Sequence, residues 1–370
     1  MVYNEIKHVL SQFQFQGIYQ RAEEIVSGNV NNTYHLFYRA EDGSALEYVL
    51  QQINGYAFRR PDIVMRNITL VTEHLRRRLE GEGISPERRI LQFIPTTTGA
   101  MFFVDEQGRS FRAYRYVDRA FAYDRVENPR HFYEAGCAFG QFQRLLTDFP
   151  VEQLEETIPD FHNTPKRFLQ FVRAAEEDRA GRAAAVEEEI DFFFDRRKMM
   201  GGIVKRIQSG EIPLRVTHND TKINNVLIDQ ETERAICVID LDTVMPGSAL
   251  YDFGDAIRFG ASSADEDEED LSRIYLDMEK FRMFTQGFLS QVNGFLSPEE
   301  IRLLPLGVKV ITCELAMRFL TDYIDGDLYF KVRSPEHNLI RARAQMQLLR
   351  DMEARDEEMD GIIREILRQS

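Results

Sequence analysis

Tryptophan is absent from this chain of 370 residues, and cysteine is scarce. The cysteines are Cys137, Cys237 and Cys313, an odd number spread far apart. This spacing excludes the disulfide framework of a small secreted domain and the clustered ligands of a structural zinc site. We therefore expect reduced, buried thiols in a cytoplasmic protein.

Long hydrophobic runs are also missing. The most apolar candidate, LPLGVKVITC, is too short to cross a bilayer and carries Lys309. The first residues, MVYNEIKHVLSQFQFQ, mix charged and amide side chains with apolar ones. They contain no apolar stretch of the kind found in secretory signal peptides. The sequence therefore predicts neither a membrane span nor export from the cytoplasm.

Positive charge is in short supply. Lys and Arg number 46 against 61 Asp and Glu, which gives a net charge of −15 at pH 7. Such a chain lacks the basic surface that neutralises nucleic-acid phosphates. Its 43% hydrophobic and 29% charged residues are ordinary for a globular protein, and its length suits two lobes. We expect no nucleic-acid partner, and no obligate protein partner is evident.

A set of polar residues with a defined spacing lies between Leu214 and Gly260. His218-x-Asp220 is followed by Asn225, and Asp240 ends an apolar run. A kinase catalytic loop needs this set, because one carboxylate accepts the proton of the attacking hydroxyl while an amide and a second carboxylate hold Mg²⁺. Each residue alone would more often be a turn residue or a helix cap. The complete set predicts Asp220 as catalytic base and Asn225 and Asp240 as metal ligands.

The local pattern predicts how these residues come together. Val226–Ile228 and Ile236–Ile239 are short apolar runs on either side of the polar turn DQETE, which indicates a β-hairpin. Asn225 precedes the first strand and Asp240 follows the second, so the hairpin brings both close enough to bind one ion. Hard oxygen ligands of this kind suit Mg²⁺, which also binds the phosphates of the nucleotide.

Longer strings around this motif resemble a known family. They are THNDTKINNVLID, VIDLDTVMPGS and YDFGDAIRFGAS, with YVLQQIN near the start and MRFLTDYIDGDLYF and PEHNLIRAR near the end. These strings are similar to the phosphotransferase family that includes aminoglycoside phosphotransferases and choline kinases, and within it to N-acetylhexosamine 1-kinases. The likeness covers nearly the whole chain.

The resemblance implies a fold and an activity. The fold would be α+β and bilobal, like a protein kinase, with a small antiparallel sheet in a nucleotide-binding lobe at residues 1–117. Residues 118–370 would form a larger, mainly helical lobe for catalysis and substrate binding. The implied cofactors are ATP and Mg²⁺. The implied reaction phosphorylates the anomeric hydroxyl of N-acetylglucosamine or N-acetylgalactosamine.

A strand–turn–strand pattern between Ile25 and Leu36 corresponds to the kinase hairpin that covers the phosphates of ATP. Its candidate nucleotide contacts are Gly28, Asn31, Asn32 and Thr33. The turn departs from a glycine-rich loop, because it contains a single glycine. An Asn-rich turn is usually only a turn, so its expected role depends on the catalytic motif downstream.

Gln51 stands on the next predicted strand, Glu47–Ile53, where most kinases carry a lysine that pairs with the α- and β-phosphates. An amide can hydrogen-bond a phosphate but brings no charge, so Mg²⁺ must neutralise more of the polyphosphate. The N-acetylhexosamine kinases resemble this chain here. Pro61–Leu79 is predicted to be an amphipathic helix. Its Glu73, the usual kind of partner for that lysine, is expected on a solvated face.

Further site residues follow from the resemblance alone. The backbone of Tyr116, Val117 and Asp118 would hold adenine at the hinge, where the pattern changes from strands to helices.

Arg318 and Tyr329 match sugar-binding positions of the family and would bind the substrate together with Asp220. A guanidinium can grip two hydroxyls, and an aromatic ring can pack on a sugar. The alternative for Arg318 is a surface salt-bridge ladder with Glu314 and Asp322, four residues to either side.

The remaining pattern is mostly helical. Helices are predicted at Tyr3–Phe15, Phe132–Leu146, Arg173–Glu189, Ala249–Phe259, Val310–Tyr323 and Asn338–Gln369. Strands are predicted at Ile90–Pro95, Met101–Val104 and Phe111–Val117, and a turn at Pro246-Gly247. Asp252 is expected to be a buried carboxylate that accepts backbone N–H groups of the catalytic loop. The acidic run Asp265–Asp270 is expected in solvent at or before the start of a helix.

Two other functions stay open. The first is a kinase of the same fold that acts on another sugar, an aminoglycoside or choline. A choline site would use an aromatic cage, for which this chain has no Trp but 14 Tyr and 27 Phe. The second is a pseudokinase that senses nucleotide or sugar, which the missing strand lysine would permit. Asp220, Asn225 and Asp240 favour a kinase, because a binding protein does not need all three.

Overall fold

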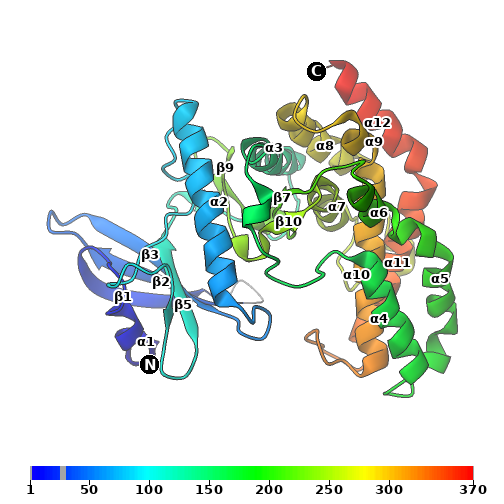
Figure 1. Ribbon diagram of the computed structural model, residues 1–370, viewed down its shortest axis with the longest axis horizontal. Helices are drawn as coiled ribbons and strands as arrows, with labels where there is room; N and C mark the ends of the chain where they lie inside the picture. Colours follow the sequence, from blue (N-terminus) through cyan, green and yellow to red (C-terminus); the bar gives the residue numbers. More distant parts are fainter. Residues whose placement is uncertain (1, 26–30, 370) are drawn as a thin grey trace.

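A computed structural model describes residues 2–25 and 31–369, and side chains from Ile6 onward. A five-stranded antiparallel sheet forms one end of the molecule, with strand order β1-β2-β3-β5-β4 (Figure 1). Its strands are β1 (Ile18–Ile25), β2 (Asn32–Arg39), β3 (Ala45–Ile53), β4 (Phe103–Val104) and β5 (Ser110–Arg115). Helix α1 (Val2–Leu10) covers one face, where Val9 packs with Leu36, Tyr48 and Phe111 in a small apolar core.

Helix α2 (Pro61–Gly81) lies between this sheet and the rest of the molecule (Figure 1). Proline at the first turn suits a helix start, because the missing N–H has no intrahelical partner there. Buried Asn67 donates hydrogen bonds to the carbonyl oxygens of Val244 (2.9 Å) and Glu155 (2.7 Å). The helix is thereby attached to the second part of the chain, while Glu73 is exposed as expected.

The second part is mainly helical and contains two small sheets, β7–β10 and β6-β8-β9. Its strands are β6 (Ala120–Phe121), β7 (Arg215–Thr217), β8 (Val226–Asp229), β9 (Ala235–Val238) and β10 (Met245–Gly247). Its helices are α3 (Pro129–Leu145), α4 (Thr164–Glu177), α5 (Glu187–Met200), α6 (Gly202–Ser209), α7 (Ala249–Gly260), α8 (Met278–Val292), α9 (Pro298–Arg302), α10 (Leu304–Asp325), α11 (His337–Ala354) and α12 (Asp356–Gln369). The largest core joins α3, α7 and α8 through Phe132, Phe253 and Phe284. The predicted fold class, α+β with an antiparallel sheet followed by a helical part, is confirmed.

Several predicted elements have other boundaries. Ile90–Pro95 is wrong as a strand, since its Phe93 forms only an isolated bridge with Tyr114. The helix predicted at Arg173–Glu189 is interrupted at Asp178, which adopts the left-handed conformation at φ 40°. Three further differences are smaller: α1 ends at Leu10, the predicted C-terminal helix divides at Arg355, and Pro246-Gly247 belongs to strand β10. Within residues 2–25 and 31–369, no helix is long and apolar enough to cross a membrane.

Helices α7 and α10 cross at two glycines. A Cβ added to Gly254 would lie 2.5 Å from the carbonyl oxygen of Gly307, and one added to Gly307 would meet the carbonyl oxygen of Leu250. The backbones therefore touch without side chains between them. This close crossing matters for function, because α7 also carries Asp252 and Asp255.

We expect Gly254→Ala to lower the free energy of unfolding by about 1–3 kcal/mol, because a backbone carbonyl cannot move aside as a side chain can. Gly361→Ala is the matched control, since a Cβ there meets nothing within 4 Å. The control should be neutral or stabilising by up to about 1 kcal/mol. Urea unfolding of both variants measures the difference. Equal effects at the two positions would show that the α7–α10 contact tolerates a methyl group.

Candidate active site

The predicted hairpin is present and brings its two ends together. Strands β8 and β9 pair antiparallel with Val226 opposite Val238, and the N–H of Ile239 donates to the carbonyl of Asn225 at 2.9 Å. Asp240 follows at once and adopts a left-handed conformation at φ 58°. The pairing of Ile239 with Asn225 therefore places the segment that carries Asp240 beside Asn225.

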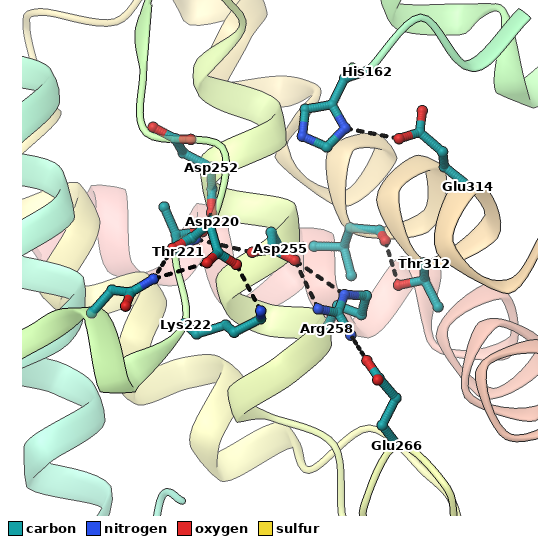
Figure 2. Close-up of polar contacts among 12 residues, drawn as sticks. His162, Asp220, Thr221, Lys222, Asp252, Asp255, Arg258, Glu266, Thr312 and Glu314 are labelled. Atoms are coloured by element: carbon teal, nitrogen blue, oxygen red, sulfur yellow. Dashed lines mark hydrogen bonds and ion pairs between the residues drawn. The ribbon is translucent and has the colours of Figure 1, made fainter. Parts of the chain in front are cut away.

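Asp220 is held by two neighbours in the catalytic loop. Asn225 Nδ2 donates to the Asp220 carboxylate at 3.1 Å and to its backbone carbonyl at 2.7 Å. Lys222 Nζ lies 2.8 Å from the other carboxylate oxygen (Figure 2). Burial alone would raise the pKa of Asp220, but the Lys222 ammonium, His218 and the hydrogen bond from Asn225 together outweigh burial and hold this pKa below its ordinary value. The carboxylate is therefore ionised at neutral pH and able to accept a proton.

The backbone of the catalytic loop is fixed by Asp252 on α7. Its buried carboxylate accepts the N–H of His218 (2.9 Å), the N–H of Asn219 (2.7 Å) and Nε2 of Gln143 (2.7 Å). The backbone carbonyl of Asp252 accepts the hydroxyl of Thr221 at 2.5 Å. The predicted structural role of Asp252 is confirmed.

One turn later on α7, Asp255 makes a second set of contacts. It accepts the N–H of Thr221 (2.9 Å) and binds Arg258 (2.9 Å), which in turn pairs with Glu266 (3.1 Å; Figure 2). Glu266 belongs to the acidic run Asp265–Asp270, which was expected in solvent at or before the start of a helix. The run directly precedes the short 3-10 helix Leu271–Arg273, and Glu269 and Asp270 are exposed. The other four side chains form ion pairs, with partners Arg125, Arg258, Arg333 and Arg273.

Asn225 and Asp240 fit the predicted Mg²⁺ site. Among the described residues, the Asp240 carboxylate has no hydrogen-bond or ion-pair partner, and burial together with Asp242 and Asp220 raises its pKa to about 7. A carboxylate in this situation favours a divalent cation. In the described ranges no group of three or more His, Cys, Asp or Glu is arranged as a metal site. Mg²⁺ does not need one, because it usually takes one or two protein carboxylates with phosphates and waters.

The predicted nucleotide residues divide into three groups. Gly28 lies outside the described residues. Thr33 and Gln51 lie together, with Gln51 Nε2 donating to the Thr33 hydroxyl at 3.2 Å, and Asn31 Nδ2 reaches Asp242 at 2.7 Å. Asn32 lies apart from them, because successive strand residues point to opposite faces, and its side chain meets that of Gln52.

The predicted hinge residues connect β5 to β6. Tyr116 stacks on His35 with ring centroids 4.0 Å apart, and Val117 packs against the core beneath the sheet. Asp118 is exposed, and its carbonyl accepts a hydrogen bond from Arg88 Nη2 at 2.7 Å. Adenine binding by these three residues stays a prediction.

Three charged residues of the site were not predicted. Lys222 follows Asp220 by two positions, and Asp242 follows Asp240 by two, so each had a local signal in the motif. Arg112 had none, because nothing in the sequence distinguishes it from Arg115 on the same strand β5. Its guanidinium forms a buried ion pair with Asp242.

Asp220, Arg318 and Tyr329 line one pocket of about 640 Å³. The Arg318 guanidinium carbon lies 5.7 Å from the ring centroid of Phe161, 5.7 Å from that of Tyr329 and 5.4 Å from that of Phe330. These distances are typical of cation–π contacts. The structure thus brings the predicted base and the predicted substrate residues to one cavity.

The salt-bridge ladder considered for Arg318 is wrong. Glu314 accepts hydrogen bonds from His162 Nδ1 (2.8 Å; Figure 2) and from the Thr164 hydroxyl (2.6 Å). Asp322 accepts the backbone N–H groups of Leu328, Tyr329 and Phe330 at 2.7–2.9 Å. Both acidic neighbours on α10 are therefore occupied, and Asp322 fixes the segment that carries Tyr329.

Comparison with known proteins places this geometry in a family. The profile of the phosphotransferase enzyme family (APH) matches residues 24–284. A microcompartment-associated aminopropanol kinase superposes with a TM-score of 0.63 at 16% identity, covering 97% of this chain and 98% of that one. An amicoumacin kinase in complex with AMP-PNP and Ca²⁺ gives 0.57 at 12% identity, covering 93% and 92%. Choline kinase from Cryptosporidium parvum Iowa II gives 0.54 at 14% identity, covering 92% and 91%. At these identities the structures show a shared kinase-like fold.

We expect Asp252→Ala to lower the free energy of unfolding by about 3 kcal/mol, because it leaves buried N–H groups without an acceptor. The matched control is Asp270→Ala, which removes an exposed carboxylate that also accepts a backbone N–H, that of Ser272. The control should cost about 1 kcal/mol or less. Denaturant unfolding measures both, and hydrogen exchange at His218 and Asn219 reports the loop directly. An unchanged exchange rate at these amides would contradict the role of Asp252.

Proposed function

We propose, from the premise that this chain belongs to the phosphotransferase enzyme family, that it transfers the γ-phosphoryl group of ATP to the anomeric hydroxyl of N-acetylglucosamine or N-acetylgalactosamine. Two kinds of observation support this acceptor. The first is the resemblance of long strings around the catalytic loop and near Arg318 to N-acetylhexosamine 1-kinases. The second is the charge of the pocket beside Asp220.

The acceptor pocket carries more positive than negative side chains. Six lysine or arginine residues line it against four acidic residues. The acidic ones are already engaged: Asp220 with Lys222, Asp255 and Glu266 with Arg258, and Glu314 with His162. Among the described residues that line the pocket, every carboxylate therefore already has a basic partner, and none is left unpaired for an ammonium group. This observation carries the proposal, because it favours a neutral, oxygen-rich acceptor over aminoglycosides, choline or an amino alcohol.

The aromatic residues of the pocket lead to the same conclusion. Phe161, Tyr329 and Phe330 surround a guanidinium, so the cation that such rings attract is already supplied by the protein. A cationic acceptor in this position would be repelled by the nearby Arg318 guanidinium. The guanidinium instead offers N–H donors to hydroxyl or carbonyl oxygens, and Tyr329 offers a ring face and a hydroxyl.

His162 adds a polar group to the wall of this pocket. Its Nδ1 is fixed by Glu314, while its Nε2 is buried without a hydrogen-bond partner among the described residues (Figure 2). A buried, unpartnered ring nitrogen is costly, at about 1–3 kcal/mol. A hydroxyl or amide N–H of the acceptor would relieve this cost once a small rotation of the ring exposes Nε2 to the pocket.

In the proposed reaction Asp220 accepts the proton of the anomeric hydroxyl and aligns it for attack. Lys222 keeps that carboxylate ionised and adds a positive charge beside it. Asn225 and Asp240 would hold Mg²⁺, which neutralises phosphate charge when bound. Positioning and charge account for most of the acceleration expected in phosphoryl transfer, since its transition state is loose.

An acceptor panel tests the proposal. ADP release is measured with ATP and Mg²⁺ and with N-acetylglucosamine, N-acetylgalactosamine, glucose, galactose, choline, kanamycin or no acceptor. We expect turnover with the two N-acetylhexosamines, and ³¹P–¹H NMR should place the phosphate on the anomeric carbon. Turnover restricted to choline or kanamycin would contradict the charge argument.

Asp220→Asn separates an enzyme from a sensor in the same assay. The substitution keeps size and hydrogen bonding but removes the base, so turnover should fall at least about 100-fold while ADP binding persists. Asp191→Asn, which changes an exposed carboxylate on α5 away from the site, is the control. A wild-type protein that binds ATP but turns over none of the acceptors would support the sensor instead.

Arg318→Met tests the acceptor site. We expect KM for the sugar to rise about 10- to 100-fold with KM for ATP unchanged, because hydrogen bonds from a charged donor are lost. Arg350→Met is the matched control, since Arg350 also lies over an aromatic ring, 4.8 Å from Phe192, and does not line this pocket. A parallel rise in both KM values would show that Arg318 acts on the fold and not on the sugar.

A further inference from the structure

Arg112 occupies the place next to the missing strand lysine. Strands β3 and β5 pair antiparallel with Gln51 directly opposite Arg112. Nε and Nη2 of Arg112 both donate to Oε1 of Gln51, at 2.9 Å and 2.7 Å. Side chains opposite each other on paired strands share a face. The guanidinium therefore lies beside the position where a strand lysine would extend.

The partner of Arg112 belongs to the other part of the molecule. Its Nη1 pairs with Asp242, and each side chain is only 3% exposed. Asp242 lies two residues after the metal-site candidate Asp240, and the partners are 130 residues apart in sequence. The pair thus joins the sheet to the segment that follows the catalytic hairpin.

Asp242 extends this connection to the phosphate-binding turn. Its second oxygen accepts a hydrogen bond from Asn31 Nδ2 at 2.7 Å, and Asn31 Oδ1 accepts the N–H of Asn54 at 2.9 Å. One chain of contacts therefore runs from Gln51 through Arg112 and Asp242 to Asn31. Of the predicted nucleotide residues, Gln51 contacts the guanidinium directly, and Asn31 is connected to it through Asp242.

In most kinases the strand lysine is paired with a glutamate of the neighbouring helix. In this chain the helix residue considered for that role, Glu73 on α2, is exposed. Asp242 provides the buried carboxylate instead, from the opposite side of the cleft. Both members of the usual pair are thus replaced by residues from other elements.

We propose that Arg112 supplies, from β5, the positive charge toward the nucleotide phosphates that a strand lysine would supply from β3. Gln51 orients the guanidinium, and Asp242 is its counter-charge. The proposal rests on the proposed function only in requiring that a nucleoside polyphosphate binds between the sheet and the catalytic hairpin.

The donor geometry of Arg112 allows this role. A guanidinium has five N–H donors, and three are used by Gln51 and Asp242. Two have no acceptor among the described residues, and phosphate oxygens match the planar fork of arginine. Because the side chain is only 3% exposed, a phosphate would reach these donors when nucleotide binding opens the surroundings of Arg112.

The charge of the site also favours a phosphate-binding role for Arg112. Asp220, Asp240 and Asp242 bring three carboxylates to this region, while Lys222 pairs with Asp220. A buried ion pair adds little net stability compared with apolar residues of equal size. Stability alone therefore gives little reason for an arginine here.

Nucleotide binding tests the proposal without any turnover. Removing Arg112 alone would leave Asp242 buried and unpaired, which threatens folding. The test variant is therefore Arg112→Met with Asp242→Asn, which removes both charges and leaves the net charge unchanged. Isothermal titration calorimetry measures its affinity for ADP and for adenosine. We expect ADP to bind about 10- to 100-fold more weakly and adenosine to bind as in wild type.

A relocated cation gives the second measurement. Adding Gln51→Lys to the double variant returns a positive charge to β3 and should recover most of the lost ADP affinity. Arg109→Met is the matched control, since Arg109 precedes the same strand and pairs with Asp105 at 2.7 Å. The control should bind both ligands as wild type does.

Three results would overturn the proposal. The first is an equal loss for ADP and adenosine in the double variant, and the second is no loss for either, since both mean that the pair is structural. The third is a wild-type protein that binds neither ligand. The proposed acceptor is tested separately. If no N-acetylhexosamine is phosphorylated, a selective loss of ADP affinity in the double variant still supports the phosphate-binding role of Arg112.

Discussion

The carboxylate of Asp252 is the interaction on which the site depends. It accepts the N–H groups of His218 and Asn219, the two residues directly before Asp220. A buried carboxylate with several N–H donors is strongly held, because charge-assisted hydrogen bonds are stronger than neutral ones. The loop is thereby tied to α7, and α7 is tied to α10 through backbone contact at Gly254 and Gly307. The position of Asp220 thus follows from helix packing far from the reacting groups.

A second constraint lies between the sheet and the helical part. Arg112 with Asp242, and Asn67 with the carbonyl of Val244, connect the two parts on either side of the segment after Asp240. Both connections end within four residues of the predicted metal ligand. A relative movement of the sheet and the helical part would therefore strain contacts that lie close to the predicted metal ligand Asp240. A lysine on β3 with a partner on α2 would lie within one part of the molecule and would not provide this link.

The sequence allowed the local features of the site to be predicted and left its long-range contacts open. The hairpin, Asp220, Asn225 and Asp240 follow one another closely along the chain, so spacing and apolar periodicity were sufficient. The role of Asp252 was predictable because α7 follows the hairpin closely, with only a short helical turn and β10 between them. Arg112 was not, since its partners Gln51 and Asp242 are 61 and 130 residues away and strand register decides which side chains meet. Asn32 is the opposite case: the motif suggested it, but strand alternation turns it away from Gln51.

Two helix boundaries were also missed. At Asp178 and Arg355 the sequence lacks the glycine or proline that usually marks a helix end.

Arg318 shows how tertiary contacts exclude one interpretation of a helical pattern. Its acidic neighbours Glu314 and Asp322 stand at the spacing of a helical salt-bridge ladder, and on an isolated helix that ladder would be the expected result. In the folded chain Glu314 is buried against His162, while Asp322 holds three consecutive N–H groups of the segment around Tyr329. Tertiary contacts therefore engage both carboxylates, so neither pairs with Arg318, and the guanidinium lines the pocket. Because the same contacts also place Tyr329 beside it, the arginine and the aromatic ring of the proposed acceptor site are positioned by one set of interactions. A substitution at Asp322 would accordingly alter the proposed acceptor site without removing a residue that contacts the acceptor.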